Sequence, residues 1–521
     1  MKRKLFIFFL LIFILVLLPA RDEDIWSFSL KKISSIVSLI EENYFQDIER
    51  EKLIYSSVRG MLQTLDPHSY FLEPSHFSRL RESHTGKYYG LGILIQKQED
   101  RLVVISPIEG GPAYRLGIQA GDVISHINGE STKPISSFDA MQKLRGPKGA
   151  KVNITIVREE LDKPFDLTIV REEISLHSVP YAFILQDDIG YVFIRNFAST
   201  TTKEFEEKMK SLAKQGMKKL ILDLRGNGGG TFIESIELSD EFLPKGALIV
   251  SIKGRNRYYN KEFRAVRNNQ YENLPLVILI DRGSASAPEI VSGAVKDNDR
   301  GLIVGEDSWG KGLVQTVFPI APDIAVALTT AKYFTPSGRS IQRDYSSLED
   351  YIFKTDVPQE KREVKYTAKG RKVLGQGGIS PDYEVKISSN RLISNLLFKG
   401  AFFSYARKFV NKKTYLSKDY IFPEKDQSSI KMGGKKKIVG YDFAIDSRVI
   451  EDFKAYLKGN KIQYDSSQFE EANQEIKRWL KREIFSLLWG IEDGIRVYRR
   501  GDPAVLKAIE VLPEAKKLIS E

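Results

Sequence analysis

The sequence of 521 residues contains no cysteine. This absence excludes disulfide bonds, thiolate catalysis and zinc sites built on cysteine. Histidine is also scarce. No histidine pair has the i, i+4 spacing of a helical zinc site, and none stands in a glycine-framed serine motif. We therefore assign structural or turn roles to all five histidines, which are His68, His76, His84, His126 and His177.

The sequence also lacks a basic arm and a basic stripe interleaved with aromatic residues, although its net charge is +11. A positive charge spread along the chain is typical of solvated lysines, and it also suits contact with an anionic membrane surface. We therefore expect no nucleic acid partner, and we keep association with a membrane surface as a hypothesis.

The apolar run at residues 5–18 is short for a membrane span. It holds fourteen apolar residues, whereas a helix that crosses a bilayer needs about 20. It follows the basic stretch MKRK and precedes Pro19 and Ala20, which is the layout of a secretory signal with an imperfect cleavage site. We predict that residues 1–20 are a signal peptide or an uncleaved anchor, and that the protein is exported to the periplasm or cell envelope.

The length of the chain and its 42% of hydrophobic residues favour several domains with buried cores. Residues 21–86 place apolar side chains at three- and four-residue spacing, which predicts a helical N-terminal region. Residues 87–172 alternate apolar and polar positions in short segments, with Asn128 and Gly129 as a hairpin turn. This second pattern predicts a small β module.

Strand and helix patterns alternate over residues 173–386, which favours an α/β layered core. Helices are expected there at 201–215, 231–243 and 287–297. Beyond residue 386 the strand patterns stop, and residues 387–521 predict a helical accessory domain. The expected fold class is therefore multidomain α+β.

The segment DLRGNGGG, residues 223–230, follows the apolar strand pattern KKLIL. It contains no G-x-G-x-x-G motif, because Thr231 occupies the third glycine position after Gly226 and Gly228. Its glycines let backbone N–H groups approach a ligand near the start of the next helix. We interpret the segment as an anion-binding or oxyanion loop, with a plain strand-to-helix turn as the alternative.

A second strand-to-helix junction carries two serines. The segment LPLVILIDRGSASAPEIVSG ends a buried strand pattern and places Pro288 in the first turn of a helix. Ser284 and Ser286 therefore lie where a nucleophile gains from a helix N-terminus. The G-x-S-x-G nucleophile motif is absent, because Ser284 stands two residues before Ser286. A helix cap is the alternative role for these serines.

Lys311 lies in GEDSWGKG, residues 305–312, which is one residue short of a phosphate-binding loop. Gly312 replaces the hydroxyl that would bind Mg²⁺, and Asp223 or Asp281 would have to supply the acidic partner. As a general base, the lysine must lose its proton near neutral pH, whereas the pKa of a free lysine is about 10.4. Burial lowers a lysine pKa, and Ser-Lys pairs are a known form of nucleophile activation. Spacing alone does not decide between the two roles.

Together these segments resemble the carboxyl-terminal processing (tail-specific) protease family. The resemblance rests on GSASAPEIVSGAVKD, GEDSWGKGLVQTV and LTTAKYFTPSGRSIQ in that order, with DPHSYFLEP, DLRGNGGG and GQGGISPDYEV in support. It covers residues 30–386, and the C-terminal part matches no motif of the family. The resemblance implies a serine peptidase with a Ser-Lys dyad and a PDZ domain.

The resemblance implies a catalytic role for three positions. Ser286 is the implied nucleophile, Lys311 is the implied general base, and Gln315 is the residue that orients the lysine. On a strand, positions 311 and 315 would face the same side.

The implied oxyanion hole combines the Ala287 N–H with a glycine N–H of the GNGGG segment. We choose Gly229 for this second donor and Gly228 as the next choice. The family's usual proline after the asparagine is Gly228 in this chain, so the contact made by the loop is not carried over directly.

The β module at residues 87–172 resembles a PDZ domain. The segment YYGLGI matches its carboxylate-binding loop, so the resemblance implies that the N–H groups of Leu91, Gly92 and Ile93 receive a peptide C-terminus. In that mode the peptide adds a β-strand and an apolar pocket takes its last side chain. The implied substrates are proteins or peptides with apolar C-termini.

We therefore predict an exported serine endopeptidase that binds protein C-termini on the PDZ module and cleaves near them through an acyl-enzyme at Ser286. This function requires no cofactor, neither a metal nor a nucleotide. Two alternatives stay open: an inactive PDZ scaffold or adaptor of the cell envelope, and a nucleotide hydrolase built on residues 305–311. A homo-oligomer and an adaptor protein are further partner hypotheses.

Overall fold

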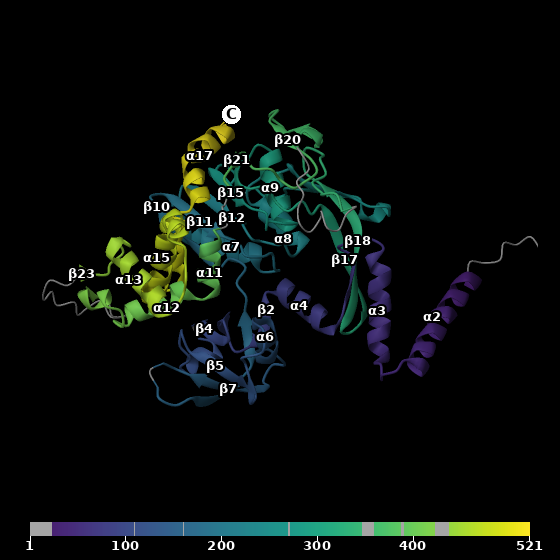
Figure 1. Cartoon of the computed structure of the whole chain (residues 1–521). Coiled ribbons are helices and arrows are strands. Elements are labelled where there is room, and N and C mark those ends of the chain that lie inside the picture. Colours follow the sequence, from purple (N-terminus) through teal and green to yellow (C-terminus); the bar gives the residue numbers. More distant parts are fainter. Residues whose placement is uncertain are drawn as a thin grey trace, which may run out of the picture. The chain divides into compact units, whose positions relative to one another are not determined.

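The computed structural model describes residues 23–108, 110–159, 161–268, 271–345, 359–386, 390–422 and 437–520. The predicted export segment, residues 1–20, lies outside these ranges. None of the helices within them is long and apolar enough to cross a membrane. Figure 1 shows the elements, coloured in chain order from purple to yellow.

The N-terminal region consists of helices and one short strand. Its elements are α2 (Glu23–Asn43), α3 (Arg50–Gln63), β1 (Tyr70–Leu72) and α4 (Pro74–Thr85). The predicted helical pattern is interrupted at DPHSYFLEP, where the Asp66 carboxylate accepts the N–H groups of His68 and Ser69 at 2.7 and 2.9 Å. After this turn, β1 pairs antiparallel with the first half of β18 (Ile324–Phe334).

The module at residues 87–172 is rich in strands, as its sequence predicted. Its strands are β2 (Lys87–Gly90), β3 (Ile93–Gln98), β4 (Arg101–Pro107), β5 (Val123–Ile127), β6 (Glu130–Ser131), β7 (Lys151–Val157), β8 (Phe165–Val170) and β9 (Glu172–Ser175), and its helices are α5 (Pro112–Arg115) and α6 (Ser137–Leu144). Five strands pair in the order β3-β4-β5-β7-β8, while β6 pairs with β5 and β2 with β9. Positive φ at Asn128 (50°) and Gly129 (82°) between β5 and β6 confirms the predicted hairpin.

A six-stranded sheet forms the centre of the region at residues 173–386. Its strands are, in spatial order, β10 (Tyr181–Gln186), β11 (Ile189–Phe193), β12 (Lys219–Asp223), β15 (Leu276–Ile280), β16 (Leu302–Gly305) and β21 (Tyr383–Glu384). β10 is antiparallel to β11, and all other neighbours in the sheet are parallel. The carboxyl ends of β12 and β15 therefore lie side by side, at the edge where open α/β sheets place their ligands.

Helices cover both faces of this central sheet. They are α7 (Thr201–Lys214), α8 (Phe232–Asp240) and α9 (Ala287–Asp297) on one face and α17 (Pro503–Ser520) on the other. Successive side chains of a strand point to opposite faces, so Leu222 and Ile278 join the first core while Ile221 and Val277 join the second. The sequence assigned residues 387–521 to an accessory domain, whereas α17, drawn in yellow in Figure 1, packs on the central sheet.

A second set of strands contains β13 (Leu248–Lys253), β14 (Lys261–Arg264), β17 (Leu313–Ala321) and the second half of β18, with a 3-10 helix at Arg257–Tyr259. Within this set, β13 and β14 share an apolar core with α8 and α9. β13 pairs with β14 and with β18, and β17 pairs with β18. A 3-10 helix (Gln359–Lys361) precedes a separate hairpin, β19 (Val364–Tyr366) and β20 (Lys372–Leu374).

The remaining C-terminal elements form a helical region with its own apolar core. They are α11 (Arg391–Phe398), α12 (Ala401–Val410), a 3-10 helix (Leu416–Asp419), α13 (Ser447–Gly459), α14 (Ser466–Glu471), α15 (Asn473–Trp489) and α16 (Ile491–Arg499). Phe402, Phe409 and Phe453 lie in this core. β22 (Tyr420–Ile421) and β23 (Lys437–Ile438) pair in parallel, so the expectation of no strand beyond residue 386 is wrong.

Candidate active site

Ser286 lies between β15 and α9, at the junction that the sequence predicted. It directly precedes the helix and has φ 63° and ψ −109°, a conformation in which a residue with a Cβ is strained. Pro288 lies in the first turn of α9. The half-buried serine is therefore held at the positive end of a helix in a conformation that a relaxed turn does not adopt.

The neighbouring Ser284 has a different environment. It is fully buried, its hydroxyl donates to the Leu224 carbonyl at 2.9 Å, and the same oxygen accepts the Asp281 N–H at 3.0 Å. These bonds use the hydroxyl to build the turn. On geometry, Ser286 is the better nucleophile candidate of the two.

The DLRGNGGG loop approaches Ser286 through Gly229. A Cβ on Gly229 would lie 2.9 Å from the Ala285 carbonyl oxygen and 3.0 Å from the Ser286 Cβ, and the φ of Gly229 is 105°, so this position requires glycine. The Asn227 side-chain oxygen accepts the Gly229 N–H at 2.9 Å, and the Asn227 carbonyl accepts the Ala285 N–H at 3.0 Å. Asn227 thus joins the two strand-to-helix junctions.

The three predicted oxyanion donors occupy different positions around the loop. Ala287 is buried and begins α9, where a backbone N–H has no acceptor within the helix. Gly228 is exposed with open space beside it, whereas Gly229 is buried. Because the Gly229 N–H already bonds to Asn227, it reaches a substrate oxygen only by exchanging that bond.

Lys311 lies between two tightly packed glycines, shortly before β17, and is half-buried. A Cβ on Gly310 would lie 2.6 Å from the Arg343 Cγ, and a Cβ on Gly312 would lie 3.0 Å from the Gln342 backbone nitrogen. The chain therefore folds closely around the lysine because its neighbours have no side chains.

The predicted relation between Lys311 and Gln315 needs a correction. β17 begins at Leu313, so Lys311 precedes the strand and the argument from a shared strand face does not apply. Gln315 lies within β17, where its side-chain amide donates to the Thr329 hydroxyl at 3.4 Å.

One buried carboxylate joins the backbones of Ser286 and Lys311. Glu289, in the first turn of α9, is fully buried. Its Oε2 accepts the N–H groups of Ser286 at 2.7 Å and Lys311 at 3.0 Å. Its Oε1 accepts the Gly310 N–H at 2.7 Å and the Ser308 hydroxyl at 2.6 Å. Two residues far apart in the sequence are thus held on a single oxygen atom.

Burial raises the pKa of the Glu289 carboxyl above its ordinary value of 4.5, and the four hydrogen bonds oppose that shift. The donors are neutral N–H and O–H groups, which stabilise the ionised form without neutralising it. Only the ionised carboxylate accepts at both oxygens without carrying a proton of its own. This acceptor is therefore lost at a higher pH than in a free glutamate.

Tyr333, in β18, contacts the same two residues from their carbonyl side. Its hydroxyl lies 2.6 Å from the Lys311 carbonyl oxygen and 3.3 Å from the Ser286 carbonyl oxygen. The side chain is fully buried. Glu289 and Tyr333 together therefore fix the main chain of Ser286 relative to that of Lys311.

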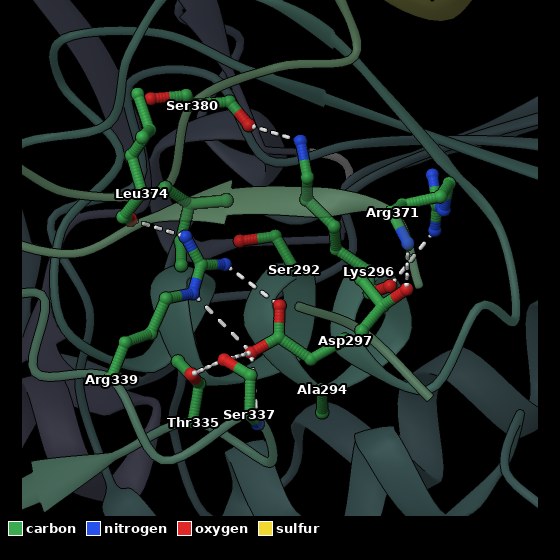
Figure 2. A network of polar contacts seen from close by, with 12 residues as sticks. Ser292, Ala294, Lys296, Asp297, Thr335, Ser337, Arg339, Arg371, Leu374 and Ser380 are labelled. Atoms are coloured by element: carbon green, nitrogen blue, oxygen red, sulfur yellow. Dashed lines mark hydrogen bonds and ion pairs between the residues drawn. The ribbon is translucent and has the colours of Figure 1, made fainter. Parts of the chain in front are cut away.

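The opposite end of α9 is held by charged side chains, as Figure 2 shows. Asp297 and Arg339 are both fully buried, and their carboxylate and guanidinium groups lie 2.7 Å apart. The Ser337 hydroxyl donates to the same carboxylate at 2.6 Å. Beside it, the Lys296 ammonium donates to the Ser380 carbonyl at 2.8 Å. The TPSGRSIQ segment, residues 335–342, thus fastens the C-terminal end of α9.

The nucleotide hydrolase alternative required Asp223 or Asp281 as an acidic partner for a magnesium ion, and both carboxylates have other partners in the structure. Asp223 accepts hydrogen bonds from the Arg225 Nε at 2.9 Å and from the Tyr191 hydroxyl at 2.6 Å. Asp281 accepts the N–H groups of Gly226 and Gly283 at 2.8 and 2.9 Å. Both carboxylates are therefore committed to the two junctions rather than to a magnesium ion beside Lys311.

Comparisons with known proteins place the chain in a family. The model of peptidase family S41 matches residues 188–348, a PDZ domain model matches 103–158, and the model of the activating protease CtpB N-terminal domain matches 20–75. The carboxy-terminal processing protease CtpA of Bacillus subtilis is 30% identical over 438 residues, which are 81% of this chain and 90% of that protein. A carboxy-terminal-processing protease of Bartonella bacilliformis is 38% identical over 317 residues, which are 60% of this chain and 72% of that protein. The chain belongs to peptidase family S41.

This S41 peptidase is a serine-type peptidase of the carboxy-terminal processing group and contains a PDZ domain. Among solved structures, a photosystem II D1 C-terminal processing protease is 30% identical, with a TM-score of 0.37 and coverage of 66% of this chain and 84% of that chain. The family confirms the resemblance found in the motifs, and the mixture of helices and sheets confirms the multidomain α+β class.

The PDZ domain of the S41 peptidase carries an apolar pocket beside its predicted carboxylate-binding loop. The cavity measures about 680 Å³ and is lined by Leu91, Gly92 and Ile93 together with Phe138 and Met141 of α6. Gly92 has φ 69°, which turns the chain into β3. All three predicted peptide-binding residues thus line one cavity, whose walls combine β3 and α6 with residues from outside the PDZ module.

Two residues that fix the site escaped the sequence reasoning. Glu289 had a local signal, because the S-x-x-E spacing of Ser286 and Glu289 is that of a helix capping box, and the structure shows the glutamate bonding back to the Ser286 N–H. Tyr333 had no such signal. It lies 22 residues from Lys311 in the sequence, and only the pairing of β18 brings its hydroxyl to the site.

Proposed function

We propose that this S41 peptidase is an endopeptidase with Ser286 as nucleophile and Lys311 as general base. The observation that carries the proposal is the shared fixation of the two residues by Glu289 and Tyr333. A nucleophile and a base that act in one step gain most from a fixed relative position. A serine that served only as a helix cap would have no need of a lysine held on the same carboxylate.

In the first half of the reaction, the Ser286 Oγ attacks the substrate carbonyl carbon while its proton passes to the neutral Lys311 amine. The N–H groups of Ala287 and of Gly229 or Gly228 stabilise the negative oxygen of the tetrahedral intermediate. The C–N bond then breaks, and the leaving amine takes the proton from Lys311. Water hydrolyses the Ser286 ester with Lys311 again as base, which releases the acid and restores the hydroxyl.

Substrate recognition is proposed for the PDZ domain. The N–H groups of Leu91, Gly92 and Ile93 bind the terminal carboxylate, and the peptide pairs with β3. The apolar cavity between β3 and α6 takes the last side chain. Proteins with apolar C-termini are therefore the proposed substrates, cut near those ends.

Three further parts of the proposal rest on the sequence. Gln315 orients Lys311, by analogy with the family pattern. Residues 1–20 direct export, so the peptidase acts in the periplasm or cell envelope, either free or anchored. A homo-oligomer or an adaptor protein is the further partner that we propose.

Ser286→Ala tests the nucleophile, with an unfolded protein that has an apolar C-terminus as substrate. We expect proteolysis to fall at least about a thousandfold, because loss of a catalytic serine removes the acyl-enzyme route. Ser292→Ala is the matched control, since Ser292 lies in the same helix and its hydroxyl only bonds the Pro288 carbonyl. Undiminished proteolysis by Ser286→Ala would remove Ser286 from the nucleophile role, whereas no proteolysis by the wild type would favour the inactive PDZ scaffold.

The pH dependence of kcat tests Lys311. A lysine base acts when neutral, so the rate should rise with pH along a limb that lies below the free-lysine pKa of about 10.4. Lys311→Ala should abolish that limb along with most of the activity. A limb that persists unchanged in the variant would remove Lys311 from the base role.

A peptide pair tests recognition separately from chemistry. Amidation of the substrate C-terminus removes the carboxylate that the PDZ loop is proposed to bind, so KM should rise about tenfold or more while kcat changes little. Equal kinetic constants for the free and the amidated peptide would argue against the PDZ contact and leave the dyad untouched.

A further inference from the structure

The loop that approaches Ser286 is anchored at its base by a residue from the far end of the chain. Arg225, two residues beyond β12, is 7% exposed. Its Nε and Nη2 donate to the two carboxylate oxygens of Asp223 at 2.9 and 2.7 Å. Its Nη1 donates to Asp502 at 3.0 Å. Asp502 directly precedes α17, so the guanidinium of Arg225 lies beside the start of the C-terminal helix.

Arg499, at the end of α16, completes the cluster. Its Nη1 donates to Asp502 at 2.8 Å, and its Nη2 lies 3.6 Å from the Asp223 Oδ2. Asp223 and Asp502 have side-chain exposures of 0% and 8%, and those of Arg225 and Arg499 are 6% and 20%. Two cations and two anions therefore balance one another in a largely buried cluster, in which Arg499 is the most exposed member.

The charges of the cluster depend on one another. Burial alone would raise the pKa of Asp502, but Arg225 and Arg499 outweigh it and lower the pKa to about 2. Burial opposes ionisation of Asp223 as well, and the same two arginines lower its pKa. Loss of Asp502 would leave a buried positive charge without its counter-ion, which a protein relieves by moving the charged group.

The loop leads from this anchor directly to the nucleophile. Its next residues are fixed by the Gly226 N–H, which donates to Asp281 at 2.8 Å, and by the Asn227 amide, which donates to the Ile194 carbonyl at 2.9 Å. The Asn227 side chain then binds the Gly229 N–H. A displacement of Arg225 would therefore move Gly229, which packs against Ser286.

Attachment of α17 to the sheet does not by itself require these charges. Val505, Ala508 and Leu512 already pack with Ile221 and Val277 in one apolar core. Well-packed apolar side chains at the same place would hold the helix at least as firmly as a buried ion cluster. The charges stand instead at the end of β12, where the loop begins.

We propose that Asp502 is a positioning residue for the oxyanion loop: by holding Arg225, it fixes the loop whose Gly229 packs against Ser286. The proposal rests on the serine chemistry proposed above. It makes the start of α17 a support of the active site, in a segment that the sequence indicated was an accessory domain.

Asp502→Asn tests this role in the full-length chain with the unfolded, apolar-tailed substrate. We expect kcat to fall at least about tenfold while KM stays within about twofold, because a small misplacement of the loop weakens transition-state stabilisation more than substrate binding. Asp502→Glu, which keeps the charge, should recover most of kcat. The affinity of a peptide aldehyde, whose adduct with Ser286 places an oxygen in the loop, should fall together with kcat.

Two controls separate positioning from stability. Val511→Ala leaves a cavity in the same helix without touching the cluster. Asp446→Asn removes another aspartate that caps a helix and pairs with an arginine, Arg448, away from the loop. Both controls should keep kcat within about twofold at a temperature where they are folded.

Two results would overturn the proposal: a kcat of Asp502→Asn within twofold of wild type, or a loss no greater than that of a Val511→Ala protein with equal Tm. If Asp502→Asn does not fold, Arg499→Met gives the same test, with an expected loss of about fivefold in kcat. Failure of the serine chemistry shows separately, as proteolysis by Ser286→Ala.

Discussion

The two ends of helix α9 are held by opposite means. At its start, Glu289 accepts four neutral donors, two of them the backbone N–H groups of Ser286 and Lys311. At its end, Asp297 meets the guanidinium of Arg339, and both side chains are fully buried. A bond to a backbone N–H fixes a main chain directly, whereas a bond to a long side chain leaves several torsions in between.

The two ends of α9 therefore have different roles: one fixes the relative position of two residues, and the other attaches the helix to the rest of the fold. The neutral donors at Glu289 fix the main chains of Ser286 and Lys311 without cancelling the charge of the carboxylate. The ion pair at Asp297 cancels a buried charge and therefore destabilises the fold strongly when one partner is removed. We infer that the start of α9 sets the catalytic geometry and that its end secures the helix in the fold.

Arg339→Met tests the role of the C-terminal end of α9. It leaves Asp297 buried without its cation, so the free energy of unfolding should fall by about 3–5 kcal/mol, while kcat of the folded protein stays within twofold. Urea denaturation at pH 7 measures the first quantity. Lys365→Met, which removes an exposed ion pair with Glu363, is the control and should change stability by less than about 1 kcal/mol. Lost activity with unchanged stability in Arg339→Met would reverse the assignment.

Glu289→Gln tests the role of the N-terminal end of α9. Each oxygen of Glu289 accepts two hydrogen bonds. A glutamine side chain has only one oxygen, so in either orientation its NH₂ group, itself a donor, faces two donor groups. We expect kcat to fall at least about a hundredfold, because Ser286 and Lys311 lose their fixed relative position. Glu483→Gln changes another buried glutamate, in α15, whose pKa is also raised by burial. Comparable kcat losses in both variants would show a general effect of buried charge.

The two kinds of carboxylate should respond to acid with opposite signs. The folded pKa of Asp502 is lowered from 3.8 to about 2, so its contribution of about 2 kcal/mol is present above pH 4 and is lost as the pH falls through 2. The folded pKa of Glu289 is raised, so acidification toward its ordinary value of 4.5 favours the folded state at this group. Urea denaturation between pH 2 and 7 should show a weaker acid loss in Asp502→Asn and a stronger one in Glu289→Gln. Parallel pH curves for the two variants would contradict both directions.

Tyr333→Phe should give the smallest effect. It removes one hydroxyl from the carbonyl side of the dyad and keeps the ring, so the loss is about 1 kcal/mol, or roughly fivefold in kcat. Tyr405→Phe removes a buried hydroxyl that bonds Asp452 in the C-terminal helices, and it should leave kcat unchanged. A loss in Tyr333→Phe as large as that in Glu289→Gln would show that the carbonyl side contributes equally to the geometry.

Local patterns in the sequence were sufficient to predict the strand-to-helix junctions that form the site. Pro288, the small residues before it and the apolar strand 276–280 define the start of α9, and the predicted helix at 287–297 has the observed bounds. These features depend on residues close together in the chain, where propensity and spacing carry the information.

Contacts between distant residues were not predictable in this way. Arg225 and Asp502 are separated by 277 positions, and each has an ordinary local role, one in a turn and one as a helix cap. The shared strand face of positions 311 and 315 failed for a related reason, since the start of β17 depends on its pairing with β18. Which residue meets which across the core is decided by the packing of whole elements.

The position of α17 has a consequence for how the chain is made. One face of the central sheet, with Tyr191, Ile221 and Val277, receives most of its apolar cover in the described residues from this helix, and Ile495 of α16 adds to it. Proteins fold progressively from the N-terminus as they leave the ribosome. Here every strand of the sheet emerges before its second layer exists. A growing chain therefore completes the apolar cover of this face, and the support of the loop beside Ser286, only after residues 503–520 have been synthesised.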